Sequence, residues 1–573
     1  MPSRLRLAFL IGADSTSTRA SIEAICDLSC VDPVAILLDV WKPKLSTRVK
    51  NLRRNIRKEG YAYIPLRLAE AAYRVTDRVV ERIFPEARVL DVLRQAFPDG
   101  CFTLADISRR YGVPVVPVNN LNSAQAVQAL AGLDADLGVV IGTRVLKRGT
   151  FARPKLGSIN LHKGAVPEYR GMPPGFWEMY HGEKHAGITV HFLDDSLDTG
   201  DIVERSQVEI LPLDTPDSLL AKLHVEGART VARAVSAIHS GAARAMTQDR
   251  KGVKPHSRPT RKQVLELRQR LPHWQTPDIA RGIVKDLFAI GLYYSGVYFL
   301  ARWLNRRRKM RAVVILYHRV NDLANDPLTV SLERFAAHML MLSRWYAPVS
   351  SSEIVEGIRR TRTLRPGSVA VHFDDCYRDV YLNAMPIANA CGVPTTAFVS
   401  SGFVGTNRVF EHDLRKSPFR FDNLQPEDLR NMLAGGMEIG AHTVNHADLG
   451  ACSLTEAERE ISGSVRDLEQ MTGRPVALFS FPFGRRAHIR DELRQAVAAA
   501  GCACMFSAFG GMVDATTDVY AIPRFGASAM HKPLYLALEI EGVSPAAIAE
   551  RLRRLVRGNH PEARAGVGAC GDA

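Results

Sequence analysis

Paired CxxC motifs, tandem repeats and low-complexity tracts are all missing from this chain of 573 residues. Its nine cysteines are scattered, which argues against a disulfide scaffold and a structural zinc site and favours a reducing, cytoplasmic compartment. Because no repeat indicates a solenoid, the fold has to be inferred from local patterns. One hydrophobic core does not serve a chain of this length, so we expect two or three domains.

Long hydrophobic runs are scarce as well. The N-terminal stretch MPSRLRLAFLIGAD has a short apolar run that Asp14 soon ends, so we expect a first buried strand and no secretory signal. Residues 287–301, LFAIGLYYSGVYFLA, fall short of the roughly 20 residues that a spanning helix needs. This segment, with the basic run RRRKMR after it, predicts either an interfacial helix that contacts a membrane surface through residues 287–309 or a helix packed between two domains.

Acidic residues are in deficit, which gives a formal net charge of +15. Such a charge is compatible with nucleic acid, an anionic membrane surface or anionic substrates. Residues 42–58 contain eight basic residues and no acidic one. Five of these fall at helical spacing and would line one helix face: Lys50, Arg53, Arg54, Arg57 and Lys58. A solvated helix face is the simpler interpretation of this pattern, and we do not expect nucleic acid to be the partner.

Strand-like and helical stretches alternate through most of the chain. LRLAFLIG, PVAILLDV, VPVVPVN and LGVVIG alternate with helical stretches such as AQAVQALAGL, which is the rhythm of a parallel sheet covered by helices. The alternation resumes with VVILYHRV, SVAVHFDD, PTTAFVSS, MEIGAHT and ALFSFPFG. The predicted class is therefore α/β.

The same patterns predict the domain limits. Residues 1–260 form a first domain, with a core to about 215 and a helical tail to about 245. Residues 261–310 are a linker that includes the apolar helix and the basic run. Residues 311–557 form a second domain, and 558–573 are a disordered tail.

A first group of polar residues lies in the N-terminal domain. Asn160 and His162 are two residues apart on a predicted strand, so their side chains share one face. Asp198 follows in the turn-like sequence LDTGD. An amide donor, an imidazole and a carboxylate could converge here on one reacting group, although residues so far apart in sequence are more often structural.

The surrounding motifs INLHKGAVPEYRG, GITVHFLD and LDTGD resemble, in order and spacing, the folate-dependent formyltransferases that act on methionyl-tRNA and glycinamide ribonucleotide. The resemblance covers residues 110–260 well and the start of the chain loosely, and it implies a Rossmann-like fold. It also implies Asn160, His162 and Asp198 as the catalytic residues.

These roles are chemically suitable. When an amine attacks a formyl carbon, Asn160 can donate a hydrogen bond to the oxyanion, and His162 can donate another or stabilise it as a cation. Asp198 can orient His162 and help to remove the amine proton. The resemblance implies 10-formyltetrahydrofolate as the donor. Its pterin would lie near two strand exits, at the residues Gly142, Thr143, Leu193 and Asp194. Residues 42–100 have no counterpart in shorter family members.

A second group of polar residues lies in the C-terminal domain. VAVHFDDCYRD places Asp374 and Asp375 at the end of a strand, and GAHTVNHADL supplies His442 and His446. Histidines at i and i+4 share one helical face and can bind one metal ion, which a carboxylate would complete. Histidine pairs at this spacing are often fortuitous, and the metal hypothesis depends on the aspartates.

Together these motifs resemble the NodB-type polysaccharide deacetylases, carbohydrate esterase family 4, over residues 311–530. The resemblance implies a distorted (β/α) barrel and a divalent metal, with zinc the expected ion, held by Asp375, His442 and His446. It implies Asp374 as the general base. In such a site the metal polarises the amide carbonyl and lowers the pKa of water.

The C-terminal domain departs from that family pattern in several places. Cys376 stands where the family usually has glycine, and FSFPFG lacks the arginine that is common before it. Neither a DxxDW motif nor a late LxH motif is evident. LYH at 316–318 is itself an LxH at the first strand, as in deacetylases that resemble a circular permutation of the family. His318 is therefore a candidate proton donor to the departing amine, or otherwise a core histidine.

The leading functional hypothesis is a bifunctional enzyme. One domain would formylate an amine, and the other would hydrolyse the N-acyl group of a sugar in glycan biosynthesis, at a cytoplasmic location or peripherally at the inner membrane face. An alternative makes tRNA the formyl acceptor. Another is a membrane-surface protein of polysaccharide assembly in which one site is degenerate.

Overall fold

The computed structural model describes residues 4–43, 45–61, 63–84, 88–248, 253–274, 278–308, 310–323, 326–484, 489–528, 531–545 and 547–548, and the predicted tail at 558–573 lies outside them. The chain divides into two units. Unit 1 holds Met1–Arg67 and Asp99–Gln275, and unit 2 holds Leu68–Pro98 and Thr276–Ala573. Residues 68–98, which the sequence places within a 1–260 domain, thus belong to unit 2.

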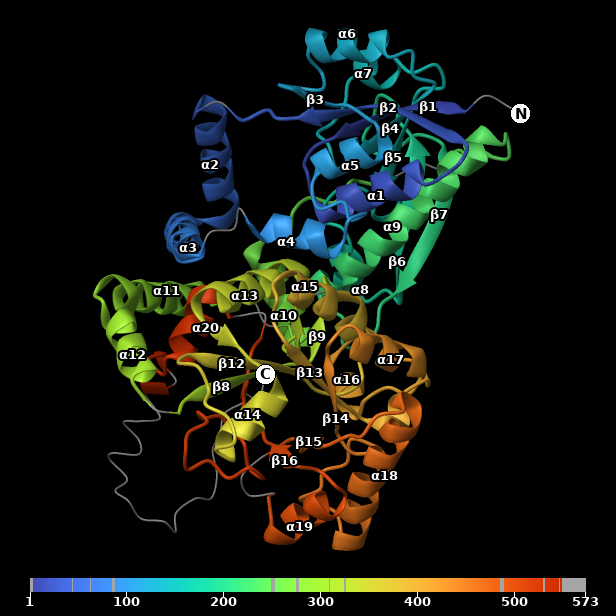
Figure 1. The fold of residues 1–573 in the computed structure, drawn as a ribbon. Helices are drawn as coiled ribbons and strands as arrows, with labels where there is room; N and C mark the ends of the chain where they lie inside the picture. The colour runs from blue at the N-terminus through green and yellow to red at the C-terminus, as the bar shows by residue number, and fades with distance from the viewer. Residues whose placement is uncertain are drawn as a thin grey trace. The chain divides into compact units, whose positions relative to one another are not determined.

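Unit 1 is an open sheet covered by helices on both faces (Figure 1). Its strands are β1 (Leu5–Ile11), β2 (Val31–Asp39), β3 (Val115–Val118), β4 (Leu137–Ile141), β5 (Ser158–His162), β6 (His185–Phe192) and β7 (Ile202–Glu209). Its helices are α1 (Thr16–Cys26), α2 (Leu45–Glu59), α5 (Leu104–Tyr111), α6 (Ala124–Gly132), α7 (Arg148–Phe151), α8 (Phe176–His181), α9 (Pro216–His239) and α10 (Arg261–Arg270).

The sheet order is β3-β2-β1-β4-β5-β6-β7, with parallel pairing from β3 to β5 and antiparallel pairing of β6 with both neighbours. Successive side chains of β1 alternate between the faces. Leu7 and Phe9 pack with the core under α1, α5 and α9, whereas Ala8 and Leu10 pack under α6 and α7. The predicted Rossmann-like class is confirmed, and strand order reverses between β1 and β4, where such sheets bind ligands.

Unit 2 contains a second parallel sheet. Its strands are β8 (Ala312–Tyr317), β9 (Arg319–Val320), β10 (Thr329–Val330), β11 (Ala347–Pro348), β12 (Ser368–Phe373), β13 (Thr395–Val399), β14 (Glu438–Ala441), β15 (Leu478–Ser480), β16 (Cys504–Phe506) and β17 (Phe525–Gly526). Its α-helices are α3 (Tyr63–Ile83, from Leu68), α4 (Val89–Ala96), α11 (Ile279–Tyr294), α12 (Val297–Arg306), α13 (Leu332–Trp345), α14 (Ser351–Ile358), α15 (Met385–Ala390), α16 (Glu411–Lys416), α17 (Pro426–Ala434), α18 (Leu454–Thr472), α19 (Asp491–Ala499) and α20 (Pro533–Ile540). A π-helical turn, η2 (Val380–Ala384), and a 3₁₀ turn, η3 (Ser401–Phe403), complete the described elements.

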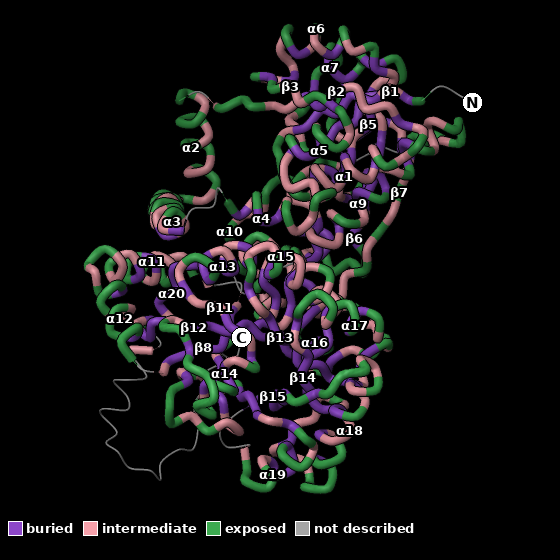
Figure 2. Tube along the Cα trace, viewed as in Figure 1, coloured by how far each residue is buried: buried purple, intermediate pink, exposed green. Residues whose placement is uncertain are grey.

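The main sheet of unit 2 curls into a distorted barrel. The strands run in the order β16-β15-β14-β13-β12-β8-β17, all parallel, and β11 pairs with β12. A parallel bridge between Phe506 and Ile522 links β16 to the segment that leads into β17. The strands are among the most buried parts of the unit (Figure 2). Parallel strands present their carboxyl ends at one edge, so residues that follow different strands meet there.

The helices α3 and α4 complete the core of unit 2. Val92 and Leu93 of α4 are buried where the helix packs against α13 and α15, and Phe84 lies edge-on to Trp345 at 5.4 Å between ring centroids. Arg334 of α13 also pairs with Glu81 of α3 at 2.8 Å. These apolar contacts explain why residues 68–98 belong to unit 2.

Two segments that the sequence singles out are helical and exposed. The five basic residues at 50–58 are all exposed on α2, which buries no residue and thus confirms a solvated basic helix. Of these five, Lys58 also donates from Nζ to the Arg258 carbonyl at 2.7 Å. The run 287–301 is divided between α11 and α12. Among the described residues, no single helix combines the length and the apolar character of a membrane span, and only α11 with α12, bent by 62°, meets that test as a pair.

Candidate functional sites

The first site lies on the adjacent strands β5 and β6 of unit 1. Asn160 and His162 project from one face of β5, and Asn160 lies opposite His191 of β6. The loop after β6 returns Asp198 to this point in a left-handed conformation, with φ of 53°. The structure therefore brings together the three predicted residues and adds His191, which sequence reasoning missed.

Short distances join the four side chains. The Asn160 amide nitrogen lies 3.3 Å from His191 Nε2 and 3.5 Å from Asp198 Oδ1. His162 Nδ1 lies 3.7 Å from Asp198 Oδ2, and His191 Nε2 lies 3.6 Å from Asp198 Oδ1. One carboxylate thus faces two imidazoles and one amide.

The hydrogen bonds fix the protonation of the imidazoles. His162 Nε2 lies 2.8 Å from the Tyr169 carbonyl, which only accepts, so Nε2 carries the proton and Nδ1 faces Asp198. Burial lowers the pKa of His162 despite the nearby carboxylate. Burial alone would raise the pKa of Asp198, yet the nearby His191 and the charge that His162 carries when protonated lower that pKa. An ionised carboxylate therefore lies beside a neutral imidazole that can accept a proton at Nδ1.

The residues predicted to bind folate lie on both sides of Asn160 along the strand direction. Gly142 and Thr143 follow β4, where Val140 pairs with Asn160. Leu193 and Asp194 follow the antiparallel β6 and lie level with the start of β5, as the hydrogen bond from the Leu193 amide to the Ser158 carbonyl at 2.8 Å shows. A Cβ on Gly12 would lie 2.2 Å from the Gly142 carbonyl oxygen, so β1 and β4 approach closely where the strand order reverses. The role of Gly142, Thr143, Leu193 and Asp194 in folate binding remains a prediction.

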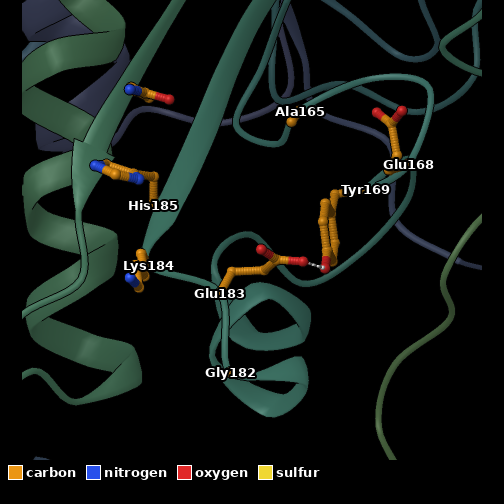
Figure 3. Close-up of a pocket in the computed structure, with 8 residues that line it drawn as sticks. Ala165, Glu168, Tyr169, Gly182, Glu183, Lys184 and His185 are labelled. Carbon is orange, nitrogen blue, oxygen red and sulfur yellow. Dashed lines mark hydrogen bonds between the residues drawn. The ribbon is translucent and has the colours of Figure 1, made fainter.

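A surface pocket of about 580 Å³ adjoins this cluster (Figure 3). Its lining residues are Ala165, Glu168, Tyr169, Gly182, Glu183, Lys184, His185 and Gln207. The Tyr169 hydroxyl donates to the Glu183 carboxylate at 2.8 Å (Figure 3). Because the Tyr169 carbonyl also accepts from His162 Nε2, one residue of the pocket wall contacts the cluster.

The second site lies at the carboxyl ends of the barrel strands in unit 2. Asp374 and Asp375 follow β12, His318 follows β8, and His442 follows β14. His446 arrives from the loop after β14, where Thr443 and His446 have φ of 63° and 56°. The predicted shared helical face for the two histidines is therefore wrong, because left-handed residues turn this backbone out of the helical conformation.

Asp375, His442 and His446 form a group suited to a metal ion. Their ligand atoms all lie within 4.8 Å of one another. Asp375 is 1% exposed, and neither of its carboxylate oxygens has a hydrogen-bond partner among the residues that the structure describes. A buried carboxylate without hydrogen bonds is costly unless it coordinates a cation. These residues fit a divalent metal, although the identity of the ion stays a prediction.

The protonation of His442 also suits a metal. His442 Nδ1 donates to the Ser480 carbonyl at 2.8 Å, so Nε2 presents its lone pair to the cluster. Burial lowers the pKa of His442 to about 4. Burial alone would raise the pKa of Asp375, yet the charge of His446 at 3.1 Å holds it well below its usual range.

Asp374 has a separate partner that the sequence did not predict. Arg524 is fully buried and donates from Nη1 and Nη2 to the two Asp374 oxygens, each at 2.7 Å. Its Nε donates to the Ser507 carbonyl at 2.9 Å, which fixes the guanidinium. Burial alone would raise the pKa of Asp374, yet Arg524 lowers it. This arginine comes from the segment directly before β17.

Two further imidazoles lie near the aspartates. Burial lowers the pKa of His318, which the charges of Asp375 and Asp374 oppose, so His318 lies within their electrostatic reach. His412 of α16, another residue that sequence reasoning missed, places Nε2 3.6 Å from Asp375 Oδ2 and 2.9 Å from the Tyr377 hydroxyl. No local motif marks His412, because α16 approaches the site only through the fold.

A buried thiol follows Asp375 in the chain, and an exposed aromatic ring lies beside His446. Cys376 is buried, and burial raises the pKa of its thiol, so it stays protonated. Phe483 is 50% exposed, with φ of 60°, and its ring lies 4.9 Å from that of His446. An exposed aromatic face beside candidate ligands suits contact with a substrate.

Family comparisons match the two units separately. Residues 104–235 match the formyl transferase family, and residues 361–505 match the polysaccharide deacetylase family. A methionyl-tRNA formyltransferase of Bacteroides fragilis is 32% identical over 150 residues, which are 26% of this chain and 46% of that protein. The chain therefore spans less than half the length of this relative.

Two solved structures resemble parts of the chain at low identity. A Streptococcus pyogenes deacetylase in complex with acetate is 20% identical with a TM-score of 0.36, and the match covers 40% of this chain and 99% of that one. Phosphoribosylglycinamide formyltransferase from Bacillus halodurans is 16% identical with a TM-score of 0.28, and the match covers 41% and 96%.

Proposed function

We propose that the chain catalyses both the acylation of an amine and the removal of an N-acyl group, because it joins a formyl transferase domain to a polysaccharide deacetylase domain. Unit 1 transfers a formyl group from 10-formyltetrahydrofolate to the amine of an amino sugar. Unit 2 hydrolyses the N-acyl group of a sugar, within glycan biosynthesis. The observation that carries the proposal is the pairing, in one chain, of the Asn160–His162–Asp198 cluster with the Asp375–His442–His446 cluster.

In unit 1, the chemistry is the attack of an amine on a formyl carbon. The Asn160 amide donates a hydrogen bond to the oxyanion that develops on the formyl oxygen. His162 accepts the amine proton at Nδ1, the nitrogen that faces Asp198. Asp198 orients His162 and stabilises the imidazolium, while His191 holds the Asn160 amide in place. Loss of the Asn160 donor is expected to cost on the order of 100-fold in rate.

In unit 2, the chemistry is hydrolysis of an amide. Asp375, His442 and His446 would hold a divalent metal, which would supply Lewis-acid polarisation of the carbonyl and a lowered pKa of water. Asp374 accepts the proton of the attacking water through a lone pair that Arg524 leaves free. His318, in its doubly protonated form, donates a proton to the departing amine. The N–C bond breaks, a carboxylate is released, and the sugar keeps a free amine.

The test of this function follows mass and metal dependence. The purified protein is incubated with 10-formyltetrahydrofolate and a panel of free, nucleotide-linked and lipid-linked amino sugars. The molecular mass of each product is then measured by mass spectrometry. A gain of one CO unit per amine supports unit 1, and no gain on any amine refutes it. For unit 2, N-acetyl and N-formyl sugars are offered with zinc present. An unchanged hydrolysis rate in Asp374→Asn would remove Asp374 as the base.

A tRNA acceptor is a second candidate, favoured by the methionyl-tRNA formyltransferase relatives and the exposed basic face of α2. Binding through phosphate contacts weakens steeply with salt because counterions are released. Gel shifts with initiator tRNA over a salt series, for the native chain and for Arg53→Gln with Arg57→Gln, decide between the acceptors. Formylation of methionyl-tRNA with no amino sugar formylated would favour this candidate. The remaining alternative, an assembly protein with one degenerate site, predicts no bound metal on elemental analysis.

A further inference from the structure

The helices α11 and α12 present their apolar side chains outward. In α11, the buried residues are Asp286 and Ala289, and in α12 they are Tyr298 and Asn305. Three of these four carry polar groups, which is the reverse of an ordinary surface helix. Figure 2 shows exposed stretches along both helices. The medium that contacts the outward face is therefore expected to be apolar at least in part.

Polar contacts attach both helices to unit 2. The Asp286 carboxylate, which is fully buried, accepts from Lys532 Nζ at 2.8 Å and from the Thr76 hydroxyl at 2.9 Å. In α12, the Asn305 amide donates to the Glu541 carboxylate at 2.8 Å and to its backbone carbonyl at 3.0 Å. These buried hydrogen bonds fix which side of each helix faces outward.

The outward surface, which we name the α11–α12 face, is defined by nine exposed apolar side chains. They are Val284, Leu287, Phe288, Tyr294, Val297, Phe299, Leu300, Trp303 and Leu304. Soluble proteins rarely expose so many large apolar side chains on neighbouring turns unless a partner covers them.

Basic residues flank this face. Arg281 precedes it in α11, and Arg306, Arg307 and Arg308 follow it, all exposed. Residues 287–311 contain no aspartate or glutamate. The Arg307 guanidinium lies 3.6 Å from the ring centroid of Trp303, so a cation and an aromatic ring are presented together at the edge of the face.

We propose that the α11–α12 face docks on the surface of an anionic lipid bilayer. Aliphatic side chains flanked by Trp, Tyr and arginine match the interfacial zone, where apolar groups enter the acyl boundary and cations meet lipid phosphates. The charge complementarity selects an anionic bilayer over an uncharged apolar partner. The buried polar contacts of Asp286 and Asn305 keep the helices against unit 2, so they lie along the interface and do not cross it. The proposal depends on neither chemical reaction of the chain.

The first test is flotation of the full chain with phosphatidylcholine vesicles, with and without phosphatidylglycerol. Binding is expected with the anionic vesicles, weakening as salt is added. The pair Leu300→Glu with Leu304→Glu is expected to lower the bound fraction about tenfold or more, since both side chains would have to enter the acyl boundary. Leu454→Glu, at an exposed leucine that begins α18 of the same unit, is the matched control and should bind like the native chain. Thermal unfolding verifies that the variants are folded.

Fluorescence of Trp303 gives a second readout that does not depend on the glutamate variants. Emission should shift to the blue on adding anionic vesicles, and brominated lipid should quench it. Trp303→Phe should lose both changes while still floating with vesicles. Three outcomes would overturn the proposal: equal binding of native and glutamate variants, a dimer that these variants dissociate without any vesicle binding, or a native chain that alkaline carbonate fails to extract, which would indicate a spanning pair.

Discussion

Arg524 reaches Asp374 from a segment 150 residues further along the chain and contacts both of its oxygens. Arg524→Lys is expected to lower kcat for deacylation by about 10- to 100-fold, because residues that orient catalytic groups have effects of that size. Lysine cannot reproduce the bidentate contact, and its flexible stem leaves the carboxylate free to rotate. KM should change little, since Arg524 is fully buried and does not contact solvent. Steady-state kinetics on an N-acyl sugar measures both constants.

Arg378→Lys is the matched control for this variant. Arg378 also contacts a single carboxylate with two nitrogens, Asp428 at 2.9 and 3.4 Å, but at the start of α17. Arg378→Lys should leave kcat for deacylation unchanged. Metal content should equal that of the native chain in both variants, because Asp375, His442 and His446 are intact. A native-like kcat for Arg524→Lys would contradict the positioning role.

The pKa of His162 predicts how the rate of formyl transfer depends on pH. The neutral imidazole is the form that accepts a proton, and burial lowers its pKa below the ordinary 6.5. Neutral His162 therefore persists further to the acid side than a free histidine. The fall of kcat/KM for formyl transfer with decreasing pH should have its midpoint below pH 6.5.

Asp198→Asn tests the cause of that midpoint. The carboxylate raises the pKa of His162 against the effect of burial. Its loss should therefore move the midpoint to still lower pH, besides slowing the reaction. A midpoint above 6.5 in the native chain, or a shift to higher pH in Asp198→Asn, would contradict neutral His162 as the proton acceptor.

At the scale of elements, the short helix α4 is expected to contribute strongly to the stability of unit 2. Leu93 is 3% exposed where α4 packs on α13 and α15. Leu93→Ala should lower the free energy of unfolding of unit 2 by about 2–5 kcal/mol, as the lost burial and the cavity add. Thermal inactivation of deacylation and of formyl transfer, followed separately, shows which unit is affected.

Leu68→Ala, at an exposed leucine of α3, is the control for Leu93→Ala. It should change the free energy of unfolding by less than about 0.5 kcal/mol. Earlier inactivation of deacylation alone is the expected result for Leu93→Ala. If formyl transfer were lost first, α4 would have to stabilise unit 1 instead.

The elements themselves could largely be predicted from sequence. Short apolar runs bounded by turn residues indicate β1, β5, β8 and β12. A buried parallel strand is such a run, and it alternates with helical stretches along the chain. The run at 287–301 was correctly predicted as helical, but its division was not. Gly296, with φ of 83°, immediately precedes α12 and turns the chain there. A single glycine inside an apolar run does not indicate whether a helix bends or continues.

At the scale of the whole molecule, the missed features all depend on long-range packing. His412 and Arg524 belong to segments with no motif of their own, and only the closure of the barrel brings them to the second site. His191 lies within GITVHFLD, but only the register of β5 with β6 places it opposite Asn160. The same is true of residues 68–98, whose amphipathic helices fit either core in sequence terms. The residues that motifs did mark, such as Asp375 and His442, follow strand ends, where local sequence suffices to place them.

The two sites should respond independently to metal removal. Among the described residues, the only group of histidine, cysteine and acidic side chains arranged for a metal is Asp375, His442 and His446 in unit 2. Dialysis against a chelator should therefore abolish deacylation and leave formyl transfer unchanged, and added zinc should restore the lost rate. Asn160→Ala should do the reverse and lower formyl transfer on the order of 100-fold with deacylation unchanged. Parallel loss of both activities on chelation, with loss of near-ultraviolet circular dichroism, would instead make the metal a requirement of the fold.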